Sequence, residues 1–136
     1  MSLIQLISAL AGDSELAVVV TDGLLLASGP HIRYVNAAFE RLTGYASHEL
    51  IGASPRILQG PATSLAARKR LSKAMRAGVR HSTTLVNYRK SGEPYRCAID
   101  VFPLLTPQGE PFAAVALERE APPRPGRRPT QADPDK

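Results

Sequence analysis

The sequence has few of the residues that several kinds of binding site require. Its one cysteine, Cys97, excludes an internal disulfide and a cysteine-rich zinc site. With no tryptophan and an aromatic content of 5%, it has little material for stacking nucleic-acid bases. No apolar run approaches the roughly 20 residues of a membrane-spanning helix, and the apolar first eleven residues lack the basic start of a signal peptide. We therefore expect a cytoplasmic protein without a membrane partner.

Acidic residues are absent between Glu49 and Glu93, although the chain has 136 residues and a net charge of +5. Nine basic residues fall in that interval: Arg56, Arg68, Lys69, Arg70, Lys73, Arg76, Arg80, Arg89 and Lys90. Clustered charge of one sign creates a local positive field. The cluster indicates either a solvated face or a surface for an acidic partner. Among acidic partners, nucleic acid is less favoured than an acidic protein surface or ligand.

Sequence signatures of catalysis are also missing. There is no nucleophile elbow, phosphate-binding glycine loop or metalloprotease motif. His31, His48 and His81 do not stand at metal-ligand spacing from one another or from Cys97. We therefore expect a protein that is not an enzyme and holds no metal ion.

The order of apolar runs and of turn residues predicts one mixed α and β domain with a hydrophobic core. An N-terminal helical segment occupies residues 1–14, the domain occupies 15–120, and a Pro- and Arg-rich tail over 121–136 is predicted to be disordered. Asn36 and Thr63 are predicted to cap helices, and Ala67, Leu71, Ala74, Met75 and Val79 to form the apolar stripe of the second of these. We expect strands over 16–21, 31–35, 83–89, 95–102 and 112–117, and helices over 4–10, 37–42, 47–52 and 64–77. A period of two places on one face Tyr95, Cys97, Ile99 and Val101 of the fourth strand, and Phe112, Ala114 and Ala116 of the fifth.

A loop rich in glycine and proline runs from Gly52 to Pro61 at the middle of the chain. Arg56 and Gln59 lie three residues apart within it, so a single helical turn places both on the same side. A short turn that carries these two side chains between glycines suits the wall of a small-molecule pocket. A plain surface loop is the alternative.

Three motifs carry a resemblance to a known family. The run Gly52-Ala53-Ser54-Pro55-Arg56-Ile57-Leu58-Gln59-Gly60 resembles the flavin-binding loop of the LOV subfamily of PAS domains. Residues 34–45 resemble the PAS signature and residues 87–95 the LOV hairpin, in the family's order. The resemblance covers residues 15–120 and implies an α+β PAS fold, with a five-stranded antiparallel sheet and short helices on one face. It also implies a sensory role in signal transduction.

The resemblance matches the family pattern at some flavin-binding positions and departs from it at others. Arg56 matches the phosphate-binding arginine, and Gln59 and Asn87 are retained. In the central loop, Pro55 stands where the family has its photoreactive cysteine, and Ser54 stands where it has an asparagine. Elsewhere, Ser72 replaces a second arginine, Cys97 a second asparagine and Ala116 a glutamine. Since each unmatched polar group costs about 1–3 kcal/mol, FMN or FAD is expected to bind weakly, without cysteinyl-flavin photochemistry.

The pocket is therefore predicted either to take another small ligand or to be filled by side chains, so that the domain acts through protein contacts. Its predicted lining is Val19, Ser54, Arg56, Gln59, Leu85, Asn87, Cys97, Ile99, Ala114 and Ala116. Cys97 is predicted to be a buried structural thiol, with a redox or adduct-forming role as the alternative.

These residues predict a sensory or regulatory module that binds a small ligand or a partner protein. One alternative is a flavin sensor with cysteine-independent redox or light chemistry, and the other is a nucleic-acid-binding regulator that uses the basic helix. Because PAS proteins often pair through a helix before the core, the segment 1–14 also predicts a homodimer contact. The alternative is that this helix packs on its own sheet.

Overall fold

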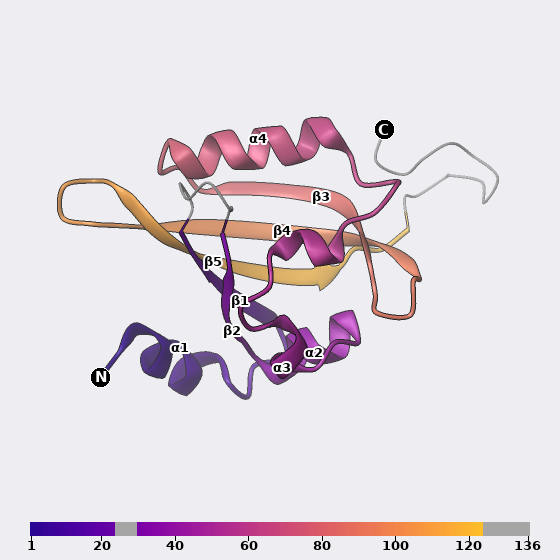
Figure 1. Cartoon of the computed structure of the whole chain (residues 1–136), viewed down its shortest axis with the longest axis horizontal. Coiled ribbons are helices and arrows are strands. Elements are labelled where there is room, and N and C mark those ends of the chain that lie inside the picture. Colours follow the sequence, from indigo (N-terminus) through magenta and orange to yellow (C-terminus); the bar gives the residue numbers. More distant parts are fainter. Residues whose placement is uncertain (24–29, 124–136) are drawn as a thin grey trace.

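The computed structural model describes residues 1–23 and 30–123. Within them lies one five-stranded antiparallel sheet, as the family resemblance implied, and its spatial order is β2-β1-β5-β4-β3. The long strands β3, β4 and β5 form the middle and one edge of this sheet (Figure 1). The strands are β1 Ala17–Asp22, β2 Ile32–Val35, β3 His81–Tyr88, β4 Pro94–Leu105 and β5 Pro111–Glu120.

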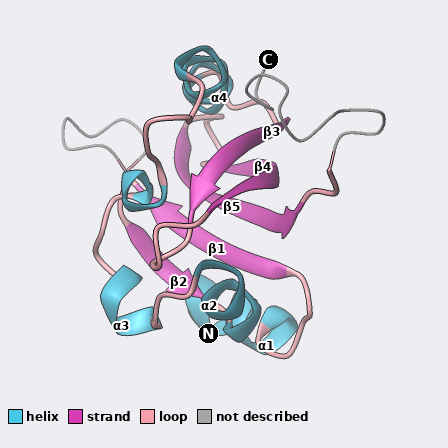
Figure 2. Ribbon diagram, turned by 90° about the vertical axis from the view of Figure 1, so that its right-hand side faces the viewer, coloured by secondary structure: helices cyan, strands magenta, loops and turns pink. Residues whose placement is uncertain are grey.

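Short helices pack over the inner face of the sheet, where the core lies. These helices are α2 Ala37–Thr43, α3 Ser47–Leu50, the 3-10 helix η1 Pro55–Leu58 and α4 Leu65–Arg76. A further helix, α1 Leu3–Ala11, precedes the sheet and buries none of its residues. Figure 2 shows α4 beside β3 at one end and α2 beside β1 at the other. Phe39, Leu50, Leu58 and Met75 from the helices join the apolar side chains of the strands in one cluster.

The alternation of β4 sets which of its side chains enter the core. Tyr95, Cys97, Ile99 and Val101 are all buried, and the residues between them are partly exposed. This confirms the period of two read from the sequence. The same period on β5 buries Ala114, Ala116 and Glu118.

The helix cap predicted at Thr63 was wrong. Ser64 is the N-cap of α4, because its hydroxyl accepts a hydrogen bond from Ala67 N at 3.1 Å. Thr63 is buried and bonds across to the sheet instead, donating from Oγ1 to Val86 O at 2.6 Å and accepting from Gly60 N at 3.0 Å.

Two apolar residues lie outside the core positions that their spacing predicted. Val79 is 56% exposed, because the chain has already left α4 through Gly78, whose φ is +71°. Phe112 is 47% exposed, since it stands at the start of β5 beside the turn from β4. β5 also runs three residues beyond its predicted end, to Glu120.

Asn36 joins three backbone segments through four side-chain hydrogen bonds. Its Oδ1 accepts from Val18 N at 2.9 Å and, as the predicted N-cap of α2, from Phe39 N at 3.0 Å. Its Nδ2 donates to Ala11 O and Leu16 O, both at 2.9 Å. The side chain is buried, so these bonds fix the end of α1, the start of β1 and the start of α2 together.

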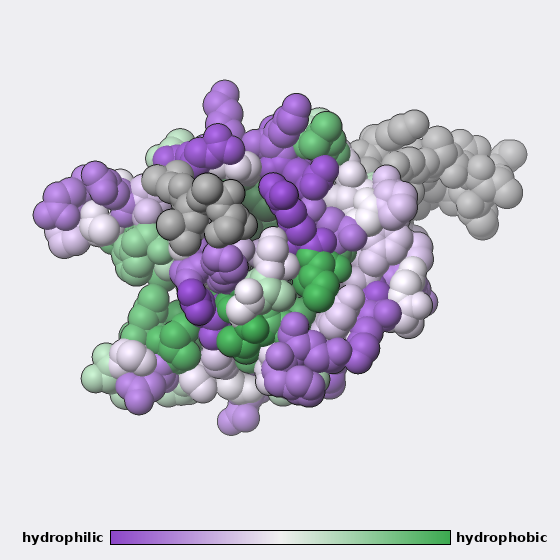
Figure 3. Space-filling model, viewed as in Figure 1, coloured by the Kyte–Doolittle hydropathy of each residue, from purple (hydrophilic) through white to green (hydrophobic). Residues whose placement is uncertain are grey.

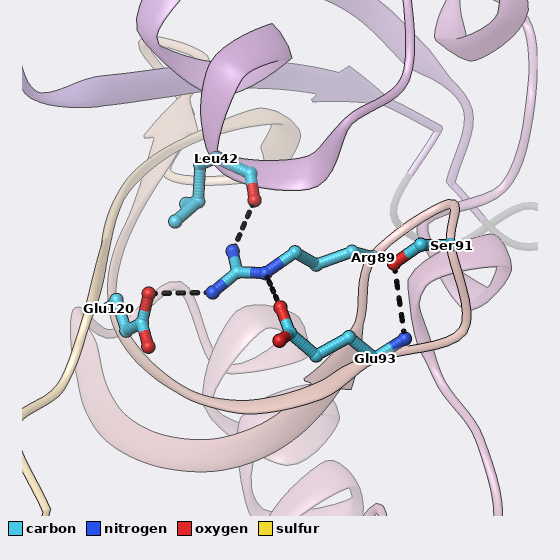
Figure 4. Close-up of polar contacts among 5 residues, drawn as sticks. All are labelled: Leu42, Arg89, Ser91, Glu93 and Glu120. Atoms are coloured by element: carbon cyan, nitrogen blue, oxygen red, sulfur yellow. Dashed lines mark hydrogen bonds and ion pairs between the residues drawn. The ribbon is translucent and has the colours of Figure 1, made fainter.

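Arg89 plays the same part at the opposite edge of the sheet (Figure 4). Its guanidinium donates to Leu42 O at 2.6 Å, to Glu93 at 2.5 Å and to Glu120 at 2.6 Å. It also stacks 4.1 Å above the centre of the Tyr95 ring. One planar group thereby holds the β3–β4 hairpin against the end of α2 and the end of β5.

Replacing Arg89 by lysine is expected to lower the free energy of unfolding by about 1–2 kcal/mol, because an ammonium group cannot reproduce the forked geometry. Lys90→Ala is the matched control, since it removes only the exposed Lys90–Glu49 ion pair, which contributes about 0–1 kcal/mol. Urea unfolding of both variants checks the difference. Equal losses in the two variants would contradict the role given to Arg89.

The predicted tail over 121–136 lies outside the described residues, except for 121–123. The predicted N-terminal helix is present as α1, with Gly12 as its C-cap. Within residues 1–23 and 30–123, no helix is long and apolar enough to cross a membrane.

Candidate functional site

A cavity of about 250 Å³ lies between the inner face of the sheet, η1 and α4. Its apolar walls come from Val19, Ile32, Phe39, Leu58, Leu71, Met75, Leu85, Ile99, Val101, Ala114 and Ala116. Its polar lining consists of Thr21, Ser54, Arg56, Gln59, Arg68, Ser72, Asn87 and Glu118, and Pro30 and Pro55 also contact it. Apolar concave space with a few converging polar groups is the usual form of a small-molecule site.

The central loop shapes the wall through local turn chemistry. Gly52 has a φ of +88°, and its N–H donates to Ile32 O at 2.8 Å while Ile32 N donates to Ala53 O at 2.8 Å. Ser54 caps the 3-10 turn by accepting from Arg56 N at 3.2 Å. The turn then brings Arg56 and Gln59 to the cavity, in the way that their spacing of three predicted.

Arg68 gives the cavity a second guanidinium group. It comes from α4, and its Nη1 donates to Gln59 Oε1 at 2.9 Å. Its Nε is buried without a hydrogen-bond partner in the described part of the chain. In the sequence, Arg68 stands among the cluster of basic residues, and no motif marks it as a site residue. Helical spacing was the available signal, because residues 68, 71, 72 and 75 fall on one side of a helix.

Glu118 lies in the wall formed by β5 and is 6% exposed. Burial disfavours the charged form, which raises the pKa of Glu118 to about 7, although a hydrogen bond from the Cys97 thiol opposes this rise. The two atoms, Cys97 Sγ and Glu118 Oε1, are 3.4 Å apart. Sequence reasoning missed Glu118 as well, although the alternation of β5 places it on the face of Ala114 and Ala116.

Cys97 is the predicted site residue that the cavity does not include. The other nine predicted residues line it: Val19, Ser54, Arg56, Gln59, Leu85, Asn87, Ile99, Ala114 and Ala116. Cys97 is fully buried, and its thiol points to the carboxyl group of Glu118. Burial, followed by the charge of Glu118, raises the pKa of the Cys97 thiol, so the reactive thiolate is disfavoured.

The cavity residues suit the phosphate group of a flavin but not its ring system. Arg56 and Arg68 offer two cations that suit a phosphate group. The carbonyl of Gln59 is already bonded to Arg68, and Ala116 has no polar atom to offer a ring. The inner wall therefore lacks the two amide side chains that the LOV pattern has at positions 97 and 116.

Comparison with known proteins gives the family. A blue-light-activated histidine kinase from Brucella anthropi is 35% identical over 99 residues, which cover 69% of this chain and 20% of the kinase. The LOV domain of a blue-light-activated histidine kinase from Erythrobacter litoralis has a TM-score of 0.71 and 30% identity, covering 77% of this chain and 94% of that one. An RNA-binding light-oxygen-voltage receptor has a TM-score of 0.77 and 26% identity, covering 87% and 33%.

The chain thus spans only a fifth of the length of the Brucella kinase. The sequence profile described as "PAS domain" matches residues 20–120, which is most of the chain. These residues contain the central loop, four complete strands of the sheet and the second half of β1, and all of the cavity lining except Val19. The chain belongs to the PAS domain family and has LOV domains among its relatives.

Proposed function

We propose that residues 15–120 form a sensory module that responds to a small molecule in the cavity, without cysteinyl-flavin photochemistry. The observation that carries the proposal is the position of Pro55. It stands in the cavity wall at the place of the photoreactive cysteine and has no nucleophile. The one thiol of the chain, Cys97, is turned toward Glu118 and does not line the cavity.

A ligand signals in such a module by binding two states of the domain unequally. The cavity walls include residues of η1, α4 and all five strands, so an occupant contacts elements that are far apart in the sequence. The domain binds and responds, and it does not itself catalyse a reaction. Its output passes to a partner protein, or to another part of a longer chain.

The molecule released from the purified protein by denaturation, identified by mass spectrometry, tests this proposal. We expect a small molecule in near-stoichiometric amount, and at least a tenfold lower occupancy in Ala116→Met, which fills the cavity. Ala98→Met is the matched control, because Ala98 is on the outer face of β4. An empty wild-type protein whose Ala116→Met variant is more stable would favour a cavity that side chains fill, with signalling by protein contacts alone.

A flavin sensor with cysteine-independent redox or light chemistry is the second candidate. It is supported by Arg56, Gln59 and Asn87 in the cavity lining and by the blue-light receptors among the relatives. When bound, a flavin supplies electron-transfer or excited-state chemistry, and Arg56 would hold its phosphate. A visible flavin band in the freshly purified protein would favour this candidate, and failure to take up added flavin would remove it.

A homodimer contact through α1 is part of the proposal. None of the residues of α1 is buried, and Leu3, Leu6 and Leu10 are 38%, 44% and 77% exposed. Apolar side chains exposed along a helix suit a second copy of the same helix. Light scattering is expected to give a dimer whose mass falls to that of a monomer in Leu6→Glu, and a monomeric wild-type protein would contradict this.

The nucleic-acid alternative depends on α4. Figure 3 shows hydrophilic side chains over most of this helix, and Lys69 and Arg70 are exposed. The RNA-binding receptor among the structural neighbours favours the same reading. Binding to a mixed-sequence RNA would have to weaken steeply with salt, and no binding at low salt would remove this alternative.

A further inference from the structure

The cavity contains a carboxyl group and a guanidinium group that are not paired with each other. In the part of the chain that the structure describes, Glu118 has one polar contact, the thiol of Cys97 at 3.4 Å. Arg68 donates to Gln59 and keeps its buried Nε without a partner. Both groups line the cavity, Glu118 from the sheet and Arg68 from α4. The carboxyl group of Glu118 thus leaves hydrogen-bond accepting capacity unused beside this space, while the guanidinium group of Arg68 lies at the same space and is bonded to Gln59.

The surroundings of Glu118 make this capacity unusual. Its neighbours across the sheet are Ala17 on β1 and Ile99 on β4, both apolar. A thiol is a weak donor, and a carboxylate can accept about four hydrogen bonds. Buried polar groups nearly always have partners, so a carboxyl group that is 6% exposed with one weak partner indicates that a donor from another molecule completes it.

The size and lining of the cavity limit what that molecule is. An apolar cavity of about 150 Å³ holds benzene, so a cavity of about 250 Å³ suits a ring system of about two fused rings. Apolar side chains of the sheet, Leu85, Ile99 and Ala116, lie on one side. Leu58, Leu71 and Met75 come from η1 and α4 on the other. A flat apolar body between these two walls places its edges at the polar residues.

We propose that Glu118 is the anchoring residue for a planar two-ring nitrogen heterocycle whose amidine or guanidine edge donates N–H groups to the carboxylate. An acceptor group on the same ligand would lie toward the guanidinium group of Arg68, which lines the cavity from α4. The inference rests on the proposed function, since it names the chemical class of the ligand in the same cavity. It differs from a flavin site, because the contact is made by a carboxylate at a position where the family motifs quoted above give no flavin partner.

Calorimetric titration at pH 8 with 2-aminobenzimidazole tests this inference. Its amidine edge can donate two N–H groups to one carboxylate, and 2-methylbenzothiazole, of similar size and without N–H groups, is the comparison ligand. We expect wild-type protein to bind 2-aminobenzimidazole at least tenfold more tightly than the comparison ligand. Glu118→Gln is expected to abolish this preference and leave the binding of 2-methylbenzothiazole unchanged.

Glu120→Gln is the matched control, because Glu120 is on the same strand and its side chain is 54% exposed in an ion pair with Arg89. It is expected to bind both compounds as the wild type does. Equal affinity of the wild type for the two compounds would overturn the Glu118 subsite and leave a ligand-binding cavity in place. If neither compound binds, both the subsite and a cavity for ligands of this size are wrong.

A measurement on the wild-type protein keeps the test independent of the folding of the variant. The carbon-13 resonance of the Glu118 carboxyl group is expected to move on addition of 2-aminobenzimidazole and to stay in place with 2-methylbenzothiazole. The Glu120 resonance reports any general change at that end of β5. Movement of the two carboxyl resonances by the same amount, or of neither, would contradict a direct contact with Glu118.

Discussion

Replacing Asn36 by alanine is expected to lower the free energy of unfolding by about 3–5 kcal/mol, the largest loss for any single change considered in this chain. The substitution removes four hydrogen bonds at once and leaves Val18 N, Ala11 O and Leu16 O without this partner. It also removes the cap of α2, which alone is typically worth about 1 kcal/mol. Urea unfolding followed by circular dichroism measures the loss.

Asn36→Asp separates the contribution of the hydrogen bonds that the side chain accepts from that of the bonds it donates. A carboxylate still accepts from Val18 N and Phe39 N, but it has no donor for Ala11 O and Leu16 O. We expect a loss between those of the wild type and the alanine variant, because about half of the hydrogen bonds survive. A loss within about 1 kcal/mol for Asn36→Ala would contradict the view that this side chain holds α1, β1 and α2 together.

The second large effect is a pH dependence of stability that comes from Glu118. Its pKa is raised from 4.5 to about 7 in the folded protein. Between these values the folded state binds a proton that the unfolded state has lost, so stability falls as the pH rises through this range. From pH 5 to pH 8, this group alone is expected to lower the free energy of unfolding by about 2–3 kcal/mol.

The comparison that isolates Glu118 is Glu118→Gln, which cannot ionise. Asp22, Glu49 and Asp100 have lowered pKa values, because each bonds to a basic side chain. Their contribution is therefore present above about pH 4 and constant between pH 5 and 8. Urea unfolding at both pH values should show a gap between wild type and variant that changes by about 2–3 kcal/mol. A gap that stays constant would show that Glu118 titrates normally.

Local signals in the sequence were enough for the sheet and most helices. Strict alternation over residues 95–102 and the Asn36 cap describe structure within a few residues, and both were confirmed. The error at Thr63 has a different origin. Thr63 and Ser64 are both good caps, and the contact of Thr63 with Val86 that decides between them joins residues 23 positions apart. Local sequence carries no signal of such a contact.

The candidate site likewise contains residues that local sequence predicts and residues that it does not. The loop residues Arg56 and Gln59 could be predicted from their spacing, and the structure places both at the cavity. Arg68 and Glu118 could not be assigned, because charged side chains on a helix and at a strand end are usually exposed. Only the packed structure shows that each turns inward. For the same reason, no motif predicted that the Cys97 thiol points toward Glu118.

The most direct test of the central proposal is to load the protein with FMN and illuminate it with blue light while its visible spectrum is recorded. With Pro55 in the loop and Cys97 bonded to Glu118, we expect no light-induced loss of the flavin band by adduct formation. Cys97→Ala, the control variant, is expected to give the same result. Reversible bleaching in the wild type that disappears in Cys97→Ala would show that this thiol forms an adduct, and would contradict the proposal.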